Sequence, residues 1–263
     1  RTWNATLKAQ KTFGDGYYVM MAYNYLNSQD VNSIEAEITG DAFAFNAALG
    51  NVNDDVLANS KYGDQHRIIG VGSKKWNYAN DKWATTVSAF FEYAKGGRFN
   101  YTYGGDINGD GSNLNDLLYI PTSSEIGEMQ FSEPGQGAAF DAYIAQDDYL
   151  NGRRGQYAER YGAISPWRGR LDLKILQDYK IKINENRTNT LQFSIDILNV
   201  GNMINSDWGV MQQPNNVQPI GVTVDPGTSM PTYTFNPDLK ETFGYDTSLA
   251  SRWQAQFGLR YIF

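Results

Sequence analysis

Seven stretches of the sequence have the pattern of β-strands, and the connections between them alternate between tight and long. Most of the stretches alternate apolar with polar residues, and a period of two residues places these on opposite faces of a strand. Residues 17–26 are apolar on both faces, and residues 67–78 are ambiguous in phase because Gly70 and Gly72 stand beside Ile69 and Val71. In the last stretch the apolar positions are Trp253, Ala255, Phe257, Leu259, Tyr261 and Phe263. The predicted strands cover about residues 3–13, 17–27, 66–78, 83–95, 167–183, 190–204 and 248–263.

The tight connections are residues 14–16, 79–82 and 184–189, and the long ones are about 28–65, 96–166 and 205–247. Within the long connections, residues 41–49 and 138–150 have the pattern of short helices. The strands are longer than the typical soluble strand of about five or six residues and match a tilted bilayer crossing. The sequence therefore predicts an all-β fold, a transmembrane antiparallel β-barrel with periplasmic turns and extracellular loops.

Seven is an odd number of strands, whereas bacterial single-chain barrels have an even number. We therefore expect this chain to be the C-terminal part of one larger barrel domain, and by itself to leave an open sheet. In the last strand, Trp253 is expected in the outer aromatic girdle and Tyr261 and Phe263 in the periplasmic one. The residues predicted to face the lumen are Arg252, Gln254, Gln256 and Arg260.

The composition of the chain argues against several kinds of structure and partner. No stretch of about 18 apolar residues is present, which excludes membrane-spanning helices. The formal net charge of −7 argues against a nucleic-acid partner. The chain has no cysteine, so it has neither a disulfide framework nor a thiolate metal site.

Four segments and the aromatic end carry a resemblance to a known family. The segments are Arg98–Pro121, Arg153–Gly162, Ser165–Ile175 and Phe193–Asn205. Together they resemble the barrel end of TonB-dependent outer-membrane receptors of the Bacteroidetes type. The first three segments are most similar to the Oar-like branch, whereas Asn-Val-Gly-Asn within the fourth is shared more widely, including with the SusC-like branch.

This resemblance implies a 22-stranded barrel with a plug domain, in the outer membrane of a Gram-negative cell. It implies import of a large or scarce ligand, driven by TonB pulling on the plug. The plug and the TonB box are not in this sequence. The implied partners are the rest of the barrel and plug, TonB, the barrel-assembly machinery, the lipid bilayer and a surface lipoprotein. Phe257, Leu259, Tyr261 and Phe263 are the candidates for the C-terminal signal that the assembly machinery reads.

Residues 106–112 read D-I-N-G-D-G-S, which resembles the first half of an EF-hand-type or dockerin-type calcium loop. Oxygen ligands stand at positions one, three and five, and glycine at six. The closing acid is expected at position twelve, which is Leu117, while Asp116 stands one residue early. We therefore keep two interpretations: a Ca²⁺ site made by Asp106, Asn108, Asp110 and Asp116, or a self-capping Asx-rich turn.

Aromatic residues in the long connections are candidates for contact with a ligand or a partner, or for packing between loops. They are Phe99, Tyr101, Tyr103, Tyr149, Trp208, Tyr233 and Phe235. His66 is the single histidine and gives little support for a catalytic triad or a zinc site, so we do not expect an enzyme. The alternatives to a transporter are a barrel that docks a surface lipoprotein or a secretion component, and a secreted β-sandwich adhesin.

Overall fold

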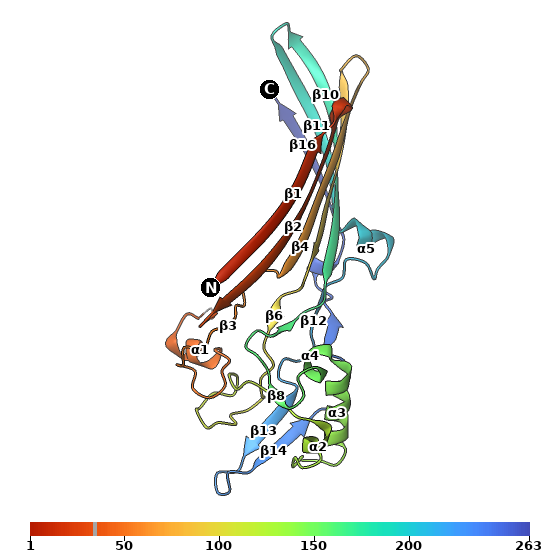
Figure 1. Ribbon diagram of the computed structural model, residues 1–263. Coiled ribbons are helices and arrows are strands. Elements are labelled where there is room, and N and C mark those ends of the chain that lie inside the picture. Colours follow the sequence, from red (N-terminus) through yellow and green to blue (C-terminus); the bar gives the residue numbers. More distant parts are fainter. Residues whose placement is uncertain (34–35) are drawn as a thin grey trace.

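The computed structural model describes residues 1–33 and 36–263, so residues 34–35 of the predicted loop 28–65 lie outside the described part. Strands make up 46% of the chain and helices 14%, which confirms the prediction of a predominantly β protein. The molecule has two parts: a long antiparallel sheet, and the long loops, which fold together at one end of the sheet (Figure 1).

Seven long strands form the sheet, and each pairs with its neighbours in the sequence of long strands, so the sheet is an antiparallel meander. All seven predicted strands are present. They are β1 (Thr2–Thr12), β2 (Tyr17–Asp30), β4 (His66–Tyr78), β5 (Trp83–Ala94), β10 (Arg168–Asn184), β11 (Arg187–Leu198) and β16 (Gln254–Ile262). The short strand β3 (Ala58–Asn59) adds to the end of β2.

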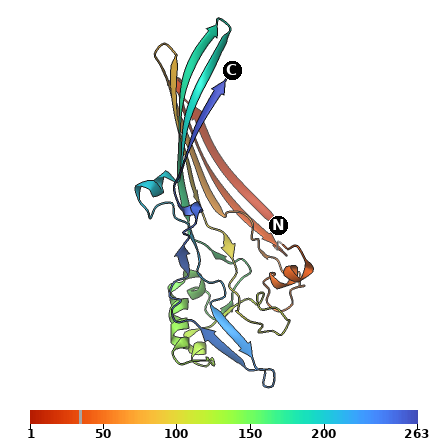
Figure 2. The same ribbon diagram turned by 180° about the vertical axis from the view of Figure 1, so that it is seen from behind.

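The tight connections gather at one end of the sheet and the long loops at the other (Figures 1 and 2). The connection after β1 is the 3-10 turn η1 (Gly14–Gly16), and β4 joins β5 through Ala79, Asn80 and Asp81, which all have positive φ. Within the described residues β1 and β16 do not pair with each other, so the sheet is open, as predicted.

Two predicted strand boundaries are wrong. Residues 200–204 form a helix, α5 (Val200–Ile204), because Asn199 turns the backbone into the left-handed region and its amide donates to the Gly209 and Ser251 carbonyls. Residues 249–251 form the 3-10 turn η2 (Leu249–Ser251), so β16 begins only at Gln254. Arg252 therefore precedes the sheet, and its Nε donates to the Thr247 carbonyl instead of facing a lumen.

The long loops contain regular structure of their own. Both predicted helices exist with shifted ends, as α1 (Thr39–Ala44) and as α3 (Gln136–Gln146) followed by α4 (Asp148–Asn151). The helix breaks at Asp147 because its carboxylate caps α4, accepting from the Leu150 N–H at 2.8 Å. The remaining elements are β6 (Arg98–Phe99), β7 (Tyr119–Ile120), α2 (Ser123–Ile126), β8 (Gln156–Tyr157), β9 (Ala163–Ile164), β12 (Gln212–Pro214), β13 (Ile220–Val224), β14 (Pro231–Phe235) and β15 (Phe243–Tyr245).

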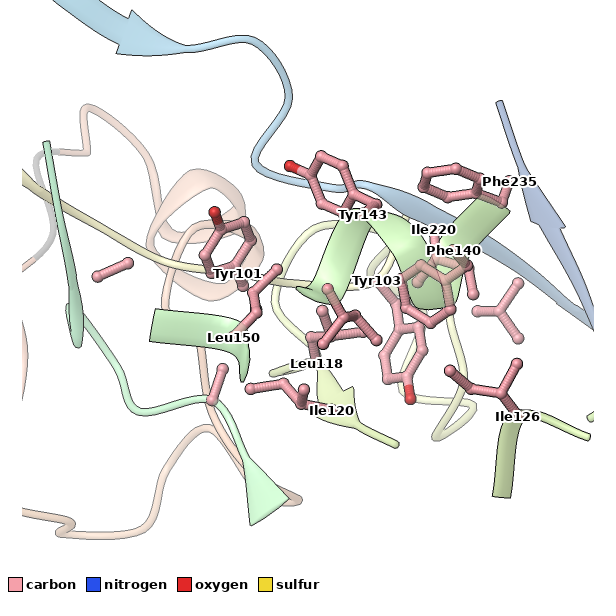
Figure 3. Close-up of a cluster of buried hydrophobic side chains, with 14 residues drawn as sticks. Tyr101, Tyr103, Leu118, Ile120, Ile126, Phe140, Tyr143, Leu150, Ile220 and Phe235 are labelled. Carbon is pink, nitrogen blue, oxygen red and sulfur yellow. The ribbon is translucent and has the colours of Figure 1, made fainter. Parts of the chain in front are cut away.

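The main buried apolar cluster lies in these loops and not against the sheet (Figure 3). We call the loop unit the segments 98–164 and 212–245, which together supply every member of the cluster. Phe140 of α3 is fully buried, with its ring 5.3 Å from that of Phe235 of β14. The hairpin β13–β14 thus packs on α3, although about a hundred residues separate them in the sequence.

Candidate functional site

The register of the sheet brings the apolar positions of β5, β10, β11 and β16 onto one face. Ile175 lies opposite Val87 on one side and Ile195 on the other, and Ile195 lies opposite Phe257. On β4 the same face carries Gly70, Gly72 and Lys74, whereas Ile69 and Val71 lie on the opposite face. The face continues through β2 to β1, where Leu7 lies opposite Tyr23. Because directly paired residues point to the same side, this face runs across all seven strands, and we call it the apolar face.

Much of this apolar face is exposed. The exposed fraction is 76% for Leu7, 57% for Met21, 67% for Phe257 and 73% for Leu259. Such a large exposed apolar surface is unusual for a water-soluble monomer and marks contact with a membrane or a partner.

Aromatic side chains border the apolar face at the end near the loops. Tyr25 of β2 lies between Trp3 and His66, with ring centroids 5.1 Å and 5.0 Å away. Tyr93 of β5 stacks on Trp167 at 4.7 Å, and the Lys95 ammonium lies 5.7 Å from the Trp167 ring. We call this group the loop-end belt.

A second group borders the apolar face near the tight turns, and we call it the turn-end belt. Trp83 of β5 lies 4.6 Å from Tyr179 of β10, and the Lys82 ammonium lies 5.2 Å from the Tyr179 ring. The Lys74 ammonium lies 3.9 Å from the ring of Tyr17. Aromatic rings with lysines beside them are typical of residues at a membrane–water interface.

The two belts are separated by about one membrane thickness. Trp83 and Tyr93 are the ends of the apolar face of β5, ten residues apart. At about 3.3 Å per residue this is about 33 Å along the strand. A tilt of about 40° reduces it to about 25 Å, the height of the apolar band of outer-membrane barrels.

The opposite face of the sheet carries charges that pair with one another. Arg67 of β4 lies 2.6 Å from Glu92 of β5, and Lys174 of β10 lies 2.6 Å from Asp196 of β11. The register places Gln254, Gln256 and Arg260 of β16 on this polar face. These pairs are partly exposed, so they stabilise the sheet only modestly.

The candidate assembly-signal residues lie on the apolar face. Phe257, Leu259 and Tyr261 belong to β16 and are all more than half exposed, and Phe263 follows the strand at 84% exposed. The structure brings these four together on one side of the sheet edge. Their reading by an assembly machinery stays a prediction.

The seven loop aromatic residues separate into three groups. Tyr101, Tyr103 and Phe235 are buried in the core of the loop unit, where they pack between loops (Figure 3). Phe99, Tyr149 and Tyr233 are half-buried at the edge of that core. Trp208 is 55% exposed and lies outside the loop unit.

A buried polar network fixes the centre of the loop unit. The Tyr101 hydroxyl donates to Asp147 Oδ2 at 2.9 Å, and the Thr242 hydroxyl donates to the same oxygen at 2.6 Å. Burial, and then the neighbouring Tyr143 and Asp147, raise the pKa of Tyr101, so it stays a protonated donor. The sequence signal that was missed is Asp147 itself, because aspartate is a typical N-cap residue and here it divides the predicted helix 138–150 into α3 and α4.

Arg160 ties the first long loop to the loop unit. Its side chain is 7% exposed, and its guanidinium donates to the backbone carbonyls of Asp30, Val31 and Val56. It also lines an open-sided cavity of about 440 Å³ between the two segments. A buried arginine that donates to three backbone carbonyls holds the first long loop against the loop unit.

The loop from Asp106 to Asp116 brings all four predicted calcium ligands together. The Asp106 carboxylate accepts from the backbone N–H groups of Gly109, Asp110 and Gly111. The Asn108 amide lies between two acids, with its Nδ2 2.6 Å from Asp116 Oδ1 and 3.4 Å from Asp110 Oδ2. These side-chain to backbone hydrogen bonds are the ones expected of an Asx-rich turn.

Asp116 is the most buried acid of this loop, at 4% exposed. Burial raises the pKa of its carboxyl group, the Ile107 N–H that it accepts lowers it, and the charges of Asp110 and Asp106 raise it. In residues 1–33 and 36–263, no group of three or more His, Cys, Asp or Glu side chains surrounds a common point as a bound metal requires.

His66 belongs to the loop-end belt. Its Nδ1 lies 2.8 Å from the Tyr23 hydroxyl, and its ring contacts Tyr25 and Trp167. These contacts join His66 to the aromatic side chains of neighbouring strands at the loop end of the apolar face. No helix in the described part of the chain is both long and apolar enough to cross a bilayer.

The chain matches no protein-family model, and no curated protein or solved structure is significantly similar to it.

Proposed function

We propose that this chain is part of the wall and the extracellular loops of a TonB-dependent outer-membrane transporter. The observation that carries the membrane part of the proposal is the exposed apolar face that runs across the seven strands, bordered by two aromatic belts about one membrane thickness apart. The free edges of β1 and β16 would pair with further strands of the same barrel, because unpaired edge N–H and C=O groups are not tolerated in hydrocarbon. The polar, ion-paired face would then line the lumen.

Two further observations favour a barrel over a β-sandwich. A sandwich would cover its apolar face with a second sheet, whereas here the main buried cluster of the described residues lies in the loop unit. A sandwich also has no reason to border that face with aromatic and lysine side chains at both ends. The role in import rests on the resemblance of segments such as Arg98–Pro121 to TonB-dependent receptors.

The sidedness of the chain is tested by labelling single cysteines, since the natural chain has none. Glu133→Cys lies in the loop unit and Glu185→Cys in a tight turn, and both positions are exposed. On intact cells, an impermeant maleimide is expected to label the Glu133→Cys variant. It should label the Glu185→Cys variant only after the outer membrane is permeabilised. Equal labelling of both variants on intact cells would contradict the proposed membrane crossing.

Import is tested separately. Cells that lack this protein and cells that lack TonB are compared with the parent on panels of peptides, glycans and iron sources. We expect one shared growth defect on a single class of nutrient. If cells that lack TonB show such a growth defect and cells that lack this protein do not, the proposal of a transporter is wrong. The alternative of a barrel that docks a partner protein would then be favoured.

A further inference from the structure

From the contacts around residues 106–116 we infer that this loop binds one Ca²⁺ ion, with Asn115 as a fifth side-chain ligand that the sequence pattern does not indicate. The inference is independent of the proposed function, because it concerns only the loop unit. The other side-chain ligands are Asp106, Asn108, Asp110 and Asp116.

Asn115 is the observation that points beyond a self-capping turn. It is 1% exposed, and its amide faces the loop, with Nδ2 3.1 Å from Asp110 Oδ2. Its Oδ1, on the same amide, is buried and has no hydrogen-bond partner. A buried amide oxygen without a partner is costly, and a cation at the acids beside it would satisfy that oxygen.

The charge of the loop supports the same conclusion. Asp106, Asp110 and Asp116 bring three carboxylates together, and in the described part of the chain none of them forms an ion pair. Hydrogen bonds from N–H groups neutralise only part of this charge. A divalent cation would neutralise most of it, in a region where burial of Asp116 weakens screening by water.

The donor set suits calcium. Every ligand is an oxygen, and Ca²⁺ takes six to eight oxygens in flexible geometry, whereas Mg²⁺ needs a near-ideal octahedron. The amide nitrogens of Asn108 and Asn115 lie against the carboxylates. A half-turn of the Asn108 amide exchanges nitrogen for oxygen with almost no change of shape, and converts that side chain from a donor into a ligand. The Oδ1 of Asn115 has no hydrogen bond to give up when it binds the ion.

The ion would lie where the three long loops meet. The backbone of Asn115 and Leu117 pairs with Ala48 of the first loop, and the Tyr103 N–H donates to the Asp116 carbonyl at 2.9 Å. The Gln218 amide of the third loop donates to the Asn113 carbonyl at 2.9 Å. Holding residues 106–116 rigid therefore stabilises the contacts of all three loops.

The test is calorimetric titration of CaCl₂ into the detergent-solubilised protein after removal of metals by a chelator. We expect saturable binding of one Ca²⁺ that Asp110→Asn weakens about tenfold or more, since loss of one charged ligand weakens such loops strongly. Asp225→Asn is the matched control, because Asp225 also caps a turn, accepting from the Gly227 and Thr228 N–H groups. Its binding isotherm should equal that of the parent.

A second measurement needs no variant. Limited proteolysis of the parent protein in Ca²⁺ and in chelator should show at least about tenfold slower cleavage of the long loops in Ca²⁺. Absence of saturable Ca²⁺ binding, equal isotherms for the parent and Asp110→Asn, or equal cleavage rates would each overturn the inference. Equal affinity for Mg²⁺ would overturn the assignment of calcium.

Discussion

Replacing Ile195 by arginine is expected to destabilise the sheet in lipid vesicles by about 2–4 kcal/mol, because the proposed membrane crossing would place the cation on the lipid face at the middle of the bilayer. Ile195 lies in the row that contains Ile175 and Phe257, between the two aromatic belts. The measurement is a urea titration of the protein in lipid vesicles, followed by the heat-modifiable band on a gel.

Two controls lie on the same strand, β11. Ser194 is half-buried like Ile195 but lies on the polar face, between Leu176 and Gly258, so Ser194→Arg should change stability little. Leu191 lies on the apolar face but at the turn-end belt, opposite Tyr179 and Tyr261, so Leu191→Arg should cost only about 0–1 kcal/mol. In a water-soluble sandwich, the stability lost on substitution by arginine would not depend on the depth of the residue in a membrane. Equal losses of stability for Leu191→Arg and Ile195→Arg would therefore favour the sandwich.

Replacing Phe140 by alanine is expected to destabilise the loop unit by about 3–5 kcal/mol while leaving the sheet intact. Phe140 is fully buried and packs on Phe131 and Phe235, so its loss leaves a cavity in the main core of the described residues. Hydrogen exchange should increase in peptides from residues 98–164 and 212–245, and not in peptides from β4, β5 and β10.

Phe45→Ala is the control for this change, because Phe45 is a loop phenylalanine that is 51% exposed. Its loss should leave exchange in the loop unit unchanged. If Phe140→Ala and Phe45→Ala gave the same exchange pattern, the loop unit would not be a cooperatively packed body. If Phe140→Ala also opened the sheet, the two parts would unfold as one.

The strands were predictable because each has a local signal. Alternation with a period of two, as in β5 and β16, needs no distant partner to be recognised, and neither does a tight turn such as Gly14-Asp15-Gly16. Boundaries were less accurate where a side chain from elsewhere decides them, as at Asn199, whose amide binds Gly209 and Ser251.

The loop unit was not predictable in the same way. Its strands are two to five residues long, and its core joins α3 to β13 and β14, so no single segment carries a periodic signal. In the sequence, Tyr101 and Phe235 are aromatic residues in long loops, and this is equally compatible with binding a ligand and with packing in a core. Only their burial, at 1% exposed each, assigns them to the core.

The sequence by itself determined the seven strands, their order and the two chemically different faces, because these follow from the alternation of residues along one strand. The spacing of the 106–116 loop also indicated four side chains, Asp106, Asn108, Asp110 and Asp116, that the structure places close together. The tertiary structure decided what depends on distant contacts. It set the register that aligns the strands and the two belts of aromatic side chains between them. It also decided how the loops fold and where the Asn115 side chain lies. These depend on packing between residues far apart in the chain, which no local pattern encodes.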